Sequence, residues 1–307
     1  MRKIFLTAIL LCLICFNNGY SARGPEGKVA GYAAAIMPAP VLNTPDFSSV
    51  FGGDDGRSLK MDGAGLIREV EFVALPGSVF EVYEIINKKG AKIYRVGTDE
   101  YPYDSAKGYF VDSRFVSVTG KKPKPRAKVL PDKKDIIRSL ISAEGSRYIW
   151  GGNCKNGIPE MLDLYPPRGK ISGKEKDIWT LKGVDCSGLL YEADGGNTPR
   201  NTGGLISCGK PVRIRGLDPA RIAEKVEPLD VIAWNGHVII ALDKARVIES
   251  RVDYDKAVPG EQGGVKIRPL RLVLDELMKE RAAVDDYNAE APQGRKRFVI
   301  RRWYPGG

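Results

Sequence analysis

Short runs of β-forming residues, separated by turn-forming residues, dominate the chain between residues 49 and 120. Residues 70–75, 79–85 and 93–96 alternate or cluster apolar positions between Gly, Pro and Asp. Because no helical period interrupts these runs, the pattern predicts a small β-barrel over residues 49–120. The preceding residues 23–48 are rich in Ala, Pro and Gly, so we expect them to form a poorly ordered leader.

A different pattern begins after a run of Lys and Pro in residues 121–131. The prolines of this run disfavour helix and its charges favour solvent, which predicts a semi-stiff basic linker. From Asp132, a plausible N-cap, apolar residues at helical spacing predict a helix that stops at Gly145. Strand-like runs follow at 231–234, 237–242, 246–249 and 297–300, with a helical pattern at 272–283. Residues 132–307 therefore form a second, α+β domain.

Residues 153–184 interrupt the second domain. They are rich in Gly, Pro and Lys and contain no clear period, so we expect a long insertion loop.

The first 22 residues have the features of a secretory signal peptide. A basic start at Arg2 and Lys3 precedes an apolar run at 4–16, which a polar stretch and small residues follow. This run is too short for a lasting membrane anchor, and no later stretch approaches the ~20 apolar residues that a spanning helix needs. A buried helix and a lipid anchor at Cys15 are the alternatives, but Ile14 stands where such an anchor site needs a small residue. We expect export, to the periplasm or outside the cell.

Composition adds limits on partners and redox state. The chain has 307 residues, 43% of them hydrophobic, and a formal net charge of +10, which suits a polyanionic surface. No nucleic-acid-binding motif accompanies the basic residues. Removal of the signal peptide leaves Cys154, Cys186 and Cys208, an odd number that indicates at least one free thiol or an intermolecular bridge. Pairing of Cys154 with Cys208 is one possibility.

Cys186 stands at the expected start of a helix. Leu189, Leu190 and Ala193 give the apolar positions of that helix, and Gly195 with Gly196 ends it. Helix N-terminal amides and the helix dipole lower the pKa of a thiol, and the thiolate is the nucleophilic form. The alternative is a buried structural cysteine.

His237 is the single histidine of the chain, at the start of an apolar strand. Histidine is the only side chain whose unperturbed pKa lies near neutrality, so His237 is the available base for a thiol nucleophile. The alternative is a histidine that only fills the core or the surface of the strand. Spacing does not choose between these, because catalytic pairs meet in space.

Four segments in order resemble the NlpC/P60 family of papain-like cysteine peptidases. They are Tyr148-Ile149-Trp150-Gly151-Gly152, Asp185-Cys186-Ser187-Gly188-Leu189, Pro199-Arg200-Asn201-Thr202, and Glu227-Pro228-Leu229-Asp230-Val231-Ile232-Ala233-Trp234 with Gly236-His237-Val238. The resemblance covers roughly residues 132–304. More weakly, residues 108–116 resemble the last strands of a bacterial SH3 domain. The implied fold is a papain-like α+β catalytic domain behind a small SH3-like β-barrel.

The resemblance implies catalytic roles for Cys186 as nucleophile and His237 as base. The third polar residue of the family falls twelve positions after the histidine, where this chain has Glu249 instead of the usual His, Asn or Gln. A carboxylate can orient an imidazole and stabilise its cation. A strand glutamate that faces water is the alternative.

Substrate-binding roles are implied for five further residues. Tyr148 would line the site, although a core aromatic is the alternative. Asp185 and Ser187 would bind the stem peptide, and Asp185 equally suits a helix cap. Asn201 and Thr202 stand where the family often has Asp-Ser or Thr-Ser.

The implied activity is hydrolysis of peptidoglycan stem peptides at the bond between γ-D-glutamate and the diamino acid. No cofactor or metal is implied. The SH3-like domain would tether the enzyme to the wall or complete the pocket, in which case an acidic residue, Asp112 or Glu100, would face the free amine of L-alanine. An amidase or acyltransferase on the same fold is one alternative, and a catalytically inactive wall-binding module is another.

Overall fold

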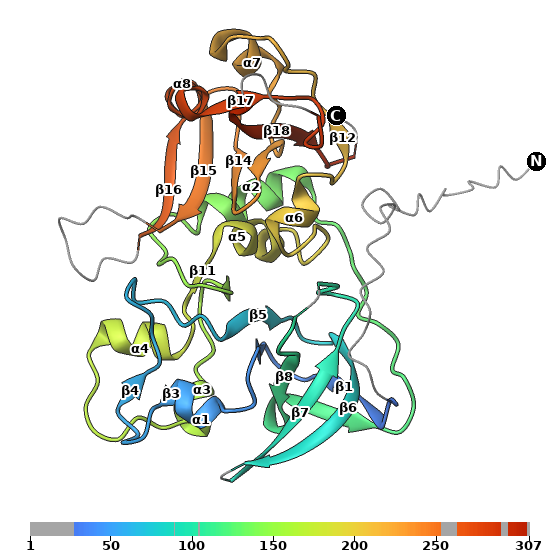
Figure 1. The fold of residues 1–307 in the computed structure, drawn as a ribbon, viewed down its shortest axis with the longest axis vertical. Coiled ribbons are helices and arrows are strands. Elements are labelled where there is room, and N and C mark those ends of the chain that lie inside the picture. Colours follow the sequence, from blue (N-terminus) through green and yellow to red (C-terminus); the bar gives the residue numbers. More distant parts are fainter. Residues whose placement is uncertain (1–27, 89, 104, 253–262, 290–293, 306–307) are drawn as a thin grey trace, which may run out of the picture.

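The computed structural model describes residues 28–88, 90–103, 105–252, 263–289 and 294–305. The predicted signal peptide lies outside these residues. Figure 1 shows the blue to green N-terminal strands below, the orange and red C-terminal sheet above, and α5 between them.

The N-terminal sheet has seven antiparallel strands in the order β5-β2-β8-β7-β6-β1-β9. Its strands are β1 (Gly31–Ala35), β2 (Ala39–Leu42), β5 (Val70–Ala74), β6 (Val79–Lys88), β7 (Ala91–Gly97), β8 (Tyr109–Asp112) and β9 (Val116–Thr119). A short pair, β3 (Phe51–Gly52) and β4 (Ser58–Leu59), follows α1 (Phe47–Val50), and η1 (Ser113–Phe115) links β8 to β9. The strands predicted at 70–75, 79–85 and 93–96 are confirmed.

One prediction about this region is wrong, and another is not confirmed. Residues 31–42 do not belong to a poorly ordered leader, because β1 and β2 pair with strands on both sides within the sheet. Ala33, Ala35 and Ala39 are buried, so the Ala-rich composition here belongs to packed strands and not to disorder. The predicted barrel is not confirmed, since the pairings of the described strands run from β5 to β9 without joining these two edges.

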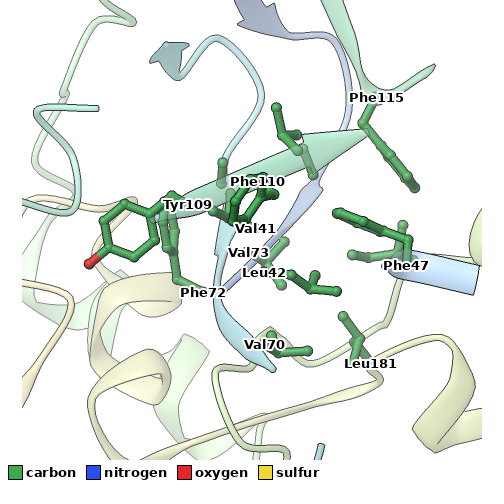
Figure 2. Packing of buried hydrophobic residues seen from close by; sticks show 14 of the residues in the cluster. Val41, Leu42, Phe47, Val70, Phe72, Val73, Tyr109, Phe110, Phe115 and Leu181 are labelled. Atoms are coloured by element: carbon green, nitrogen blue, oxygen red, sulfur yellow. The ribbon is translucent and has the colours of Figure 1, made fainter. Parts of the chain in front are cut away.

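The core beneath this sheet is built largely from aromatic and aliphatic side chains, and every residue of β2 and of β8 is buried. Figure 2 shows Phe47, Phe72, Phe110 and Phe115 with Val and Leu residues of β2, β5 and β8. Burying such side chains stabilises the fold by roughly 1.5–3 kcal/mol each.

Residues 153–184 are also not a loop. They contain β10 (Asn153–Cys154), α3 (Met161–Leu164), α4 (Gly173–Trp179) and β11 (Gly183–Val184). Ser172 and Glu175 form a capping box at the start of α4, a signal present in the sequence. Trp179 and Leu181 are buried in the same core as the N-terminal sheet, and Figure 2 places Leu181 beside Phe47 and Val70. The segment therefore completes the N-terminal core.

The second sheet also has seven strands. Six follow the order β12-β18-β13-β14-β15-β16, and β17 pairs with β18 in parallel. The strands are β12 (Lys210–Pro211), β13 (Val231–Trp234), β14 (His237–Ala241), β15 (Arg246–Arg251), β16 (Gly264–Pro269), β17 (Arg281–Ala283) and β18 (Lys296–Arg302). The predicted strands of this domain are confirmed.

Helices cover both faces of this sheet. They are α2 (Lys133–Ile141), α5 (Cys186–Ala193), α6 (Thr202–Leu205), α7 (Pro219–Lys225) and α8 (Leu270–Glu280). The core on one face includes residues of α2 and α5, and the core on the other includes residues of α7 and α8. The helix predicted at 272–283 is confirmed in its first part, but β17 begins at Arg281.

The linker at 121–131 has no helix or strand, yet part of it is docked. Arg126 donates to Glu100 (Nε to Oε1, 2.8 Å) and to the carbonyl oxygens of Gly195 and Gly196 at the end of α5. Tyr191 of α5 also donates to Glu100 at 2.8 Å. These contacts fix the N-terminal sheet against the helix that begins with Cys186. Within the described ranges, no helix has the length and apolar character needed to cross a membrane.

Candidate active site

Cys186 occupies the first turn of α5, as predicted. The Asp185 side chain caps this helix by accepting a hydrogen bond from the backbone N–H of Gly188 at 2.7 Å. Cys186 carries a free thiol and is 7% exposed. Burial raises the pKa of the Cys186 thiol to about 12, the Asp185 carboxylate adds to the shift, and Arg200 with nearby backbone N–H groups offsets part of it. The predicted lowering of this pKa is therefore wrong, because loss of hydration outweighs the helix terminus.

The backbone N–H of Val238 is close enough to Cys186 to lower its pKa, and Val238 directly follows His237 on β14. Cys186, Val238 and Ile240 share one buried core, so α5 packs directly against the strand that carries the histidine. The structure thus brings the helix start and the histidine strand together.

His237 and Glu249 are hydrogen-bonded to each other, with Nε2 of His237 2.8 Å from Oε2 of Glu249. The Glu249 side chain is 2% exposed, so it does not face water. Burial acts to raise the pKa of Glu249, but the hydrogen bond with His237 and the charges of Arg268 and Arg251 outweigh it, and the pKa lies below its ordinary value. Glu249 is therefore a carboxylate, which can only accept a hydrogen bond from Nε2–H. This leaves Nδ1 of a neutral His237 as the basic nitrogen.

Arg268 of β16 binds the second oxygen of Glu249, with Nη1 3.1 Å from Oε1. Its other terminal nitrogen binds Glu276 of α8. The sequence analysis missed Arg268, since pairing between β15 and β16 is what places it beside Glu249.

The turn before His237 is held from two sides. Thr202 accepts a hydrogen bond from the backbone N–H of Gly236 at 3.1 Å, and Tyr287 accepts one from the N–H of Asn235 at 3.0 Å. Asn201 caps α6 by accepting from the N–H of Gly204. The Asn201 and Thr202 side chains, predicted to bind substrate, thus bond to backbone groups near the site.

Arg200 is the centre of a buried polar cluster that the sequence analysis did not recognise. It is 2% exposed and binds both oxygens of Asp185, at 2.9 and 2.8 Å. It also donates to Ser187 and to Asn153, whose amide pairs with the backbone of Val73 in β5. Asp185 and Ser187 lie beside the nucleophile as predicted, but Arg200 uses much of their hydrogen-bonding capacity. Arg200 stands inside the Pro199–Thr202 motif, and this position in the sequence could have identified it as a site residue.

Two buried tyrosines lie near this cluster. Tyr148 is buried, and its pKa is raised by burial and then by the charges of Asp185 and Cys186. Tyr101, from the segment between β7 and β8, has its pKa raised by burial, while the charge of Arg200 acts to lower it and Glu71 and Asp185 raise it further. Tyr148 therefore lies where the resemblance places it, and the N-terminal domain contributes Tyr101.

The acidic residues expected to face a substrate amine are already bound. Asp112 is fully buried and accepts hydrogen bonds from Arg114 and Tyr165. Glu100 binds Arg126 and Tyr191. Cys154 has a free thiol, so the considered pairing with Cys208 is not formed.

A cavity of about 410 Å³ lies beside the histidine. Tyr148, Trp150, Trp234, His237 and Glu249 are among its lining residues, whereas Cys186 is not. Among the residues that the structure describes, no three His, Cys, Asp or Glu side chains are grouped to hold a metal ion.

No family model matches the sequence, and no curated protein matches it. Among solved structures, the chain is similar to an NlpC/P60 family protein from Bacillus cereus, with 16% identity over 89% of this chain and 63% of that chain and a TM-score of 0.33. It is similar to the P60 domain of an antigen from M. avium subspecies paratuberculosis, with 19% identity over 55% of this chain and 93% of that one and a TM-score of 0.31.

A third similar structure is RipD from Mycobacterium tuberculosis, described as a non-catalytic NlpC/p60 domain protein adapted to peptidoglycan binding. Its identity is 19% over 55% of this chain and 95% of that one, with a TM-score of 0.30. This chain spans less than two thirds of the Bacillus cereus protein. These TM-scores are too low to assign a function, which has to come from the site residues.

Proposed function

We propose that this chain is an exported cysteine peptidase of the NlpC/P60 type that hydrolyses peptidoglycan stem peptides. The bond proposed is the one between γ-D-glutamate and the diamino acid. The observation that carries the proposal is the 2.8 Å contact between His237 and the buried Glu249, beside a helix that starts with Cys186. A buried carboxylate on the far nitrogen of a histidine is the arrangement that orients a general base.

The proposed reaction proceeds through a thioester. Nδ1 of His237 takes the proton of the Cys186 thiol as the sulfur attacks the γ-carbonyl carbon, and Glu249 stabilises the imidazolium that forms. His237 then gives the proton to the leaving nitrogen as the amide bond breaks. Water, deprotonated by His237, hydrolyses the thioester. The raised pKa of Cys186 means that the resting nucleophile is a neutral thiol, so proton transfer to His237 accompanies attack.

Tyr148, Asp185 and Ser187 are the proposed contacts for the D-glutamyl part of the stem, since they lie around the nucleophile. The polar cluster at Arg200 holds Asp185 in place, because the guanidinium donates to both carboxylate oxygens.

The N-terminal domain, proposed to be SH3-like, would close the pocket at the alanine end. Its edge strand β5 is hydrogen-bonded to Asn153 of the catalytic half, and Tyr101 approaches Arg200 and Asp185. Glu71 of β5 is the acidic residue that acts on Tyr101. With Asp112 and Glu100 engaged elsewhere, Glu71 is the proposed partner of a free N-terminal ammonium.

A wall-binding module without catalysis is the second candidate, and the burial of Cys186 favours it. An amidase or acyltransferase would use the same three residues, so only its products distinguish it.

Digestion of purified muropeptides, read by mass, tests the proposal. The parent protein should give two products, a sugar that carries only L-alanyl-D-glutamate and a peptide that begins with the diamino acid. Cys186→Ala should release neither, while Cys154→Ser, which changes a thiol outside the site, should behave as the parent. Binding without any product from the parent protein would favour the non-catalytic module, and products cut at another bond would favour the amidase.

A further inference from the structure

The chemistry of the proposed reaction fixes where the leaving half of the substrate lies. His237 has to protonate the leaving nitrogen, so that nitrogen and the residue attached to it lie next to the imidazole. The cavity of about 410 Å³ touches His237 and Glu249 but not Cys186. It therefore lies on the histidine side of the reacting bond, where the leaving half emerges.

A second cavity, of about 440 Å³, adjoins the first through Arg281, which lines both. Arg281, Arg295, Lys296 and Arg297 line this second cavity, and no Asp or Glu among the described residues does. Arg295 and Arg297 donate to backbone carbonyl oxygens, which do not neutralise their charge. The path away from His237 thus leads into a cationic surface.

Unlike Arg68, Arg251 and Arg268, which line the first cavity alone, Arg281 lines both cavities. Its guanidinium stacks on the ring of Trp234 at 4.5 Å from the centroid, and Trp234 pairs with His237 across the β13–β14 hairpin. Unlike Arg268, it forms no ion pair with any carboxylate among the described residues, and Glu280 beside it is exposed. A half-buried guanidinium that lies over an indole and forms no ion pair with a described carboxylate is preorganised for a ligand carboxylate.

We propose that these two cavities form the subsite for the leaving half of the substrate and that Arg281 binds a carboxylate of that half. The enzyme would then select stems whose diamino acid carries a free carboxylate over stems in which it is amidated. This inference rests on the proposed function and names the substrate class of the same site.

The experiment compares two ligands that differ in one group. Cys186→Ala protein is titrated with L-Ala-γ-D-Glu-L-Lys and with the same tripeptide as its C-terminal carboxamide, and dissociation constants are measured by calorimetry. The free carboxylate should bind about tenfold more tightly, as expected for a hydrogen bond between charged groups. Adding Arg281→Gln should abolish that ratio. Adding Arg271→Gln, which removes an exposed arginine paired with Asp275 outside both cavities, should preserve it.

Binding of the carboxamide serves as the internal check that each variant is folded, because the inference concerns a ratio. Equal constants for the two tripeptides, or an equal loss of the ratio with Arg271→Gln, would overturn the subsite. Hydrolysis by the parent protein is measured in parallel. If it cleaves neither tripeptide, the proposed function fails, and the binding ratio still decides whether Arg281 recognises the carboxylate.

Discussion

Glu249 bridges His237 and Arg268, with one carboxylate oxygen 2.8 Å from Nε2 of the histidine and the other 3.1 Å from the guanidinium. Glu249 is ionised although its side chain is almost fully buried, and Arg268 provides the compensating positive charge. A neutral third residue would need no such partner. Glu249 and Arg268 therefore act as a pair beside the histidine.

The two oxygens of Glu249 give a graded prediction for substitutions. Glu249→Gln keeps an acceptor for His237, so it should retain more activity than Glu249→Ala, which leaves the imidazole without a partner. Loss of the orienting group should lower kcat/KM by on the order of 10³-fold or more in the alanine variant. Rates on a stem tripeptide measure both. Near-parental rates in both variants would contradict a role for Glu249.

Arg268→Gln tests the bridge from the other side. Without the guanidinium, the Glu249 carboxylate is less compensated and stabilises the imidazolium more strongly, so the acidic limb of kcat/KM should move to higher pH. The loss of activity at pH 7 should be smaller than in Glu249→Ala, because the hydrogen bond to His237 remains. Arg271→Gln removes the same charge from α8 away from Glu249 and should leave the profile in place. An unchanged limb in Arg268→Gln would show that Arg268 is only structural.

The raised pKa of Cys186 predicts slow alkylation near neutrality. A thiol with a pKa of about 12 is almost entirely protonated at pH 6.5, and its thiolate fraction rises about tenfold for each pH unit up to that value. The iodoacetamide rate of the free protein should therefore increase steadily with pH, without the acidic plateau of a thiolate–imidazolium pair. If Cys186 is instead alkylated rapidly at pH 6.5 and His237→Ala abolishes that reaction, the thiolate–imidazolium pair forms in the free protein.

Local patterns predicted most elements of this fold, because each depends on nearby residues. The start of α5 followed from Asp185 and the apolar positions after it, and β14 from the apolar run after His237. The prediction failed where distant packing decides. Residues 31–35 and 39–42 contain only two strong strand formers, Tyr32 and Val41, and become strands through neighbours far along the chain. Residues 153–184 are ordered because Trp179 and Leu181 are buried in the core of the N-terminal sheet.

The site divides in the same way. Cys186, His237 and Glu249 lie in recognisable segments, and the structure brings the last two into contact. Arg268, Tyr101 and Asn153 could not be found from the sequence, since each reaches the site through sheet pairing or contact between domains. The thiol pKa was mispredicted for a related reason, because burial is a property of the packed fold.

Arg200 should be among the costliest residues to replace. Arg200→Met removes the charged partner of the buried Asp185 carboxylate and one hydrogen-bond donor each to Ser187 and Asn153, so it should lower the free energy of unfolding by about 3–5 kcal/mol. Arg138→Met breaks the exposed pair with Asp135 and should cost less than about 1 kcal/mol. Urea unfolding measures both. Similar losses in the two variants would mean that Arg200 does not stabilise the cluster.

The last prediction concerns what the N-terminal domain does for the substrate. If it closes the pocket, L-Ala-γ-D-Glu-diamino acid should be cleaved much faster than its N-acetyl form, and free stems faster than stems on glycan. Glu71 is half-buried and held by Asn43, which donates to Oε1 at 2.9 Å, so its contact with the ammonium would be partly desolvated. Loss of such a contact costs on the order of 2 kcal/mol or more, which is roughly 30-fold in kcat/KM.

Glu71→Gln should therefore remove most of the preference for the free amine, by lowering the rate on the uncapped peptide more than the rate on the capped one. Glu84→Gln, an exposed carboxylate on β6 of the same sheet, is the matched control and should keep the preference. The alternative is a domain that only tethers the enzyme to the wall. A tether predicts equal kcat/KM for the two peptides, faster cleavage of intact wall than of free stems, and no effect of Glu71→Gln on either peptide. Equal rates on the capped and the uncapped peptide would thus rule out the closed pocket. The contact between Arg126 and Glu100 would then serve only to hold the two domains together.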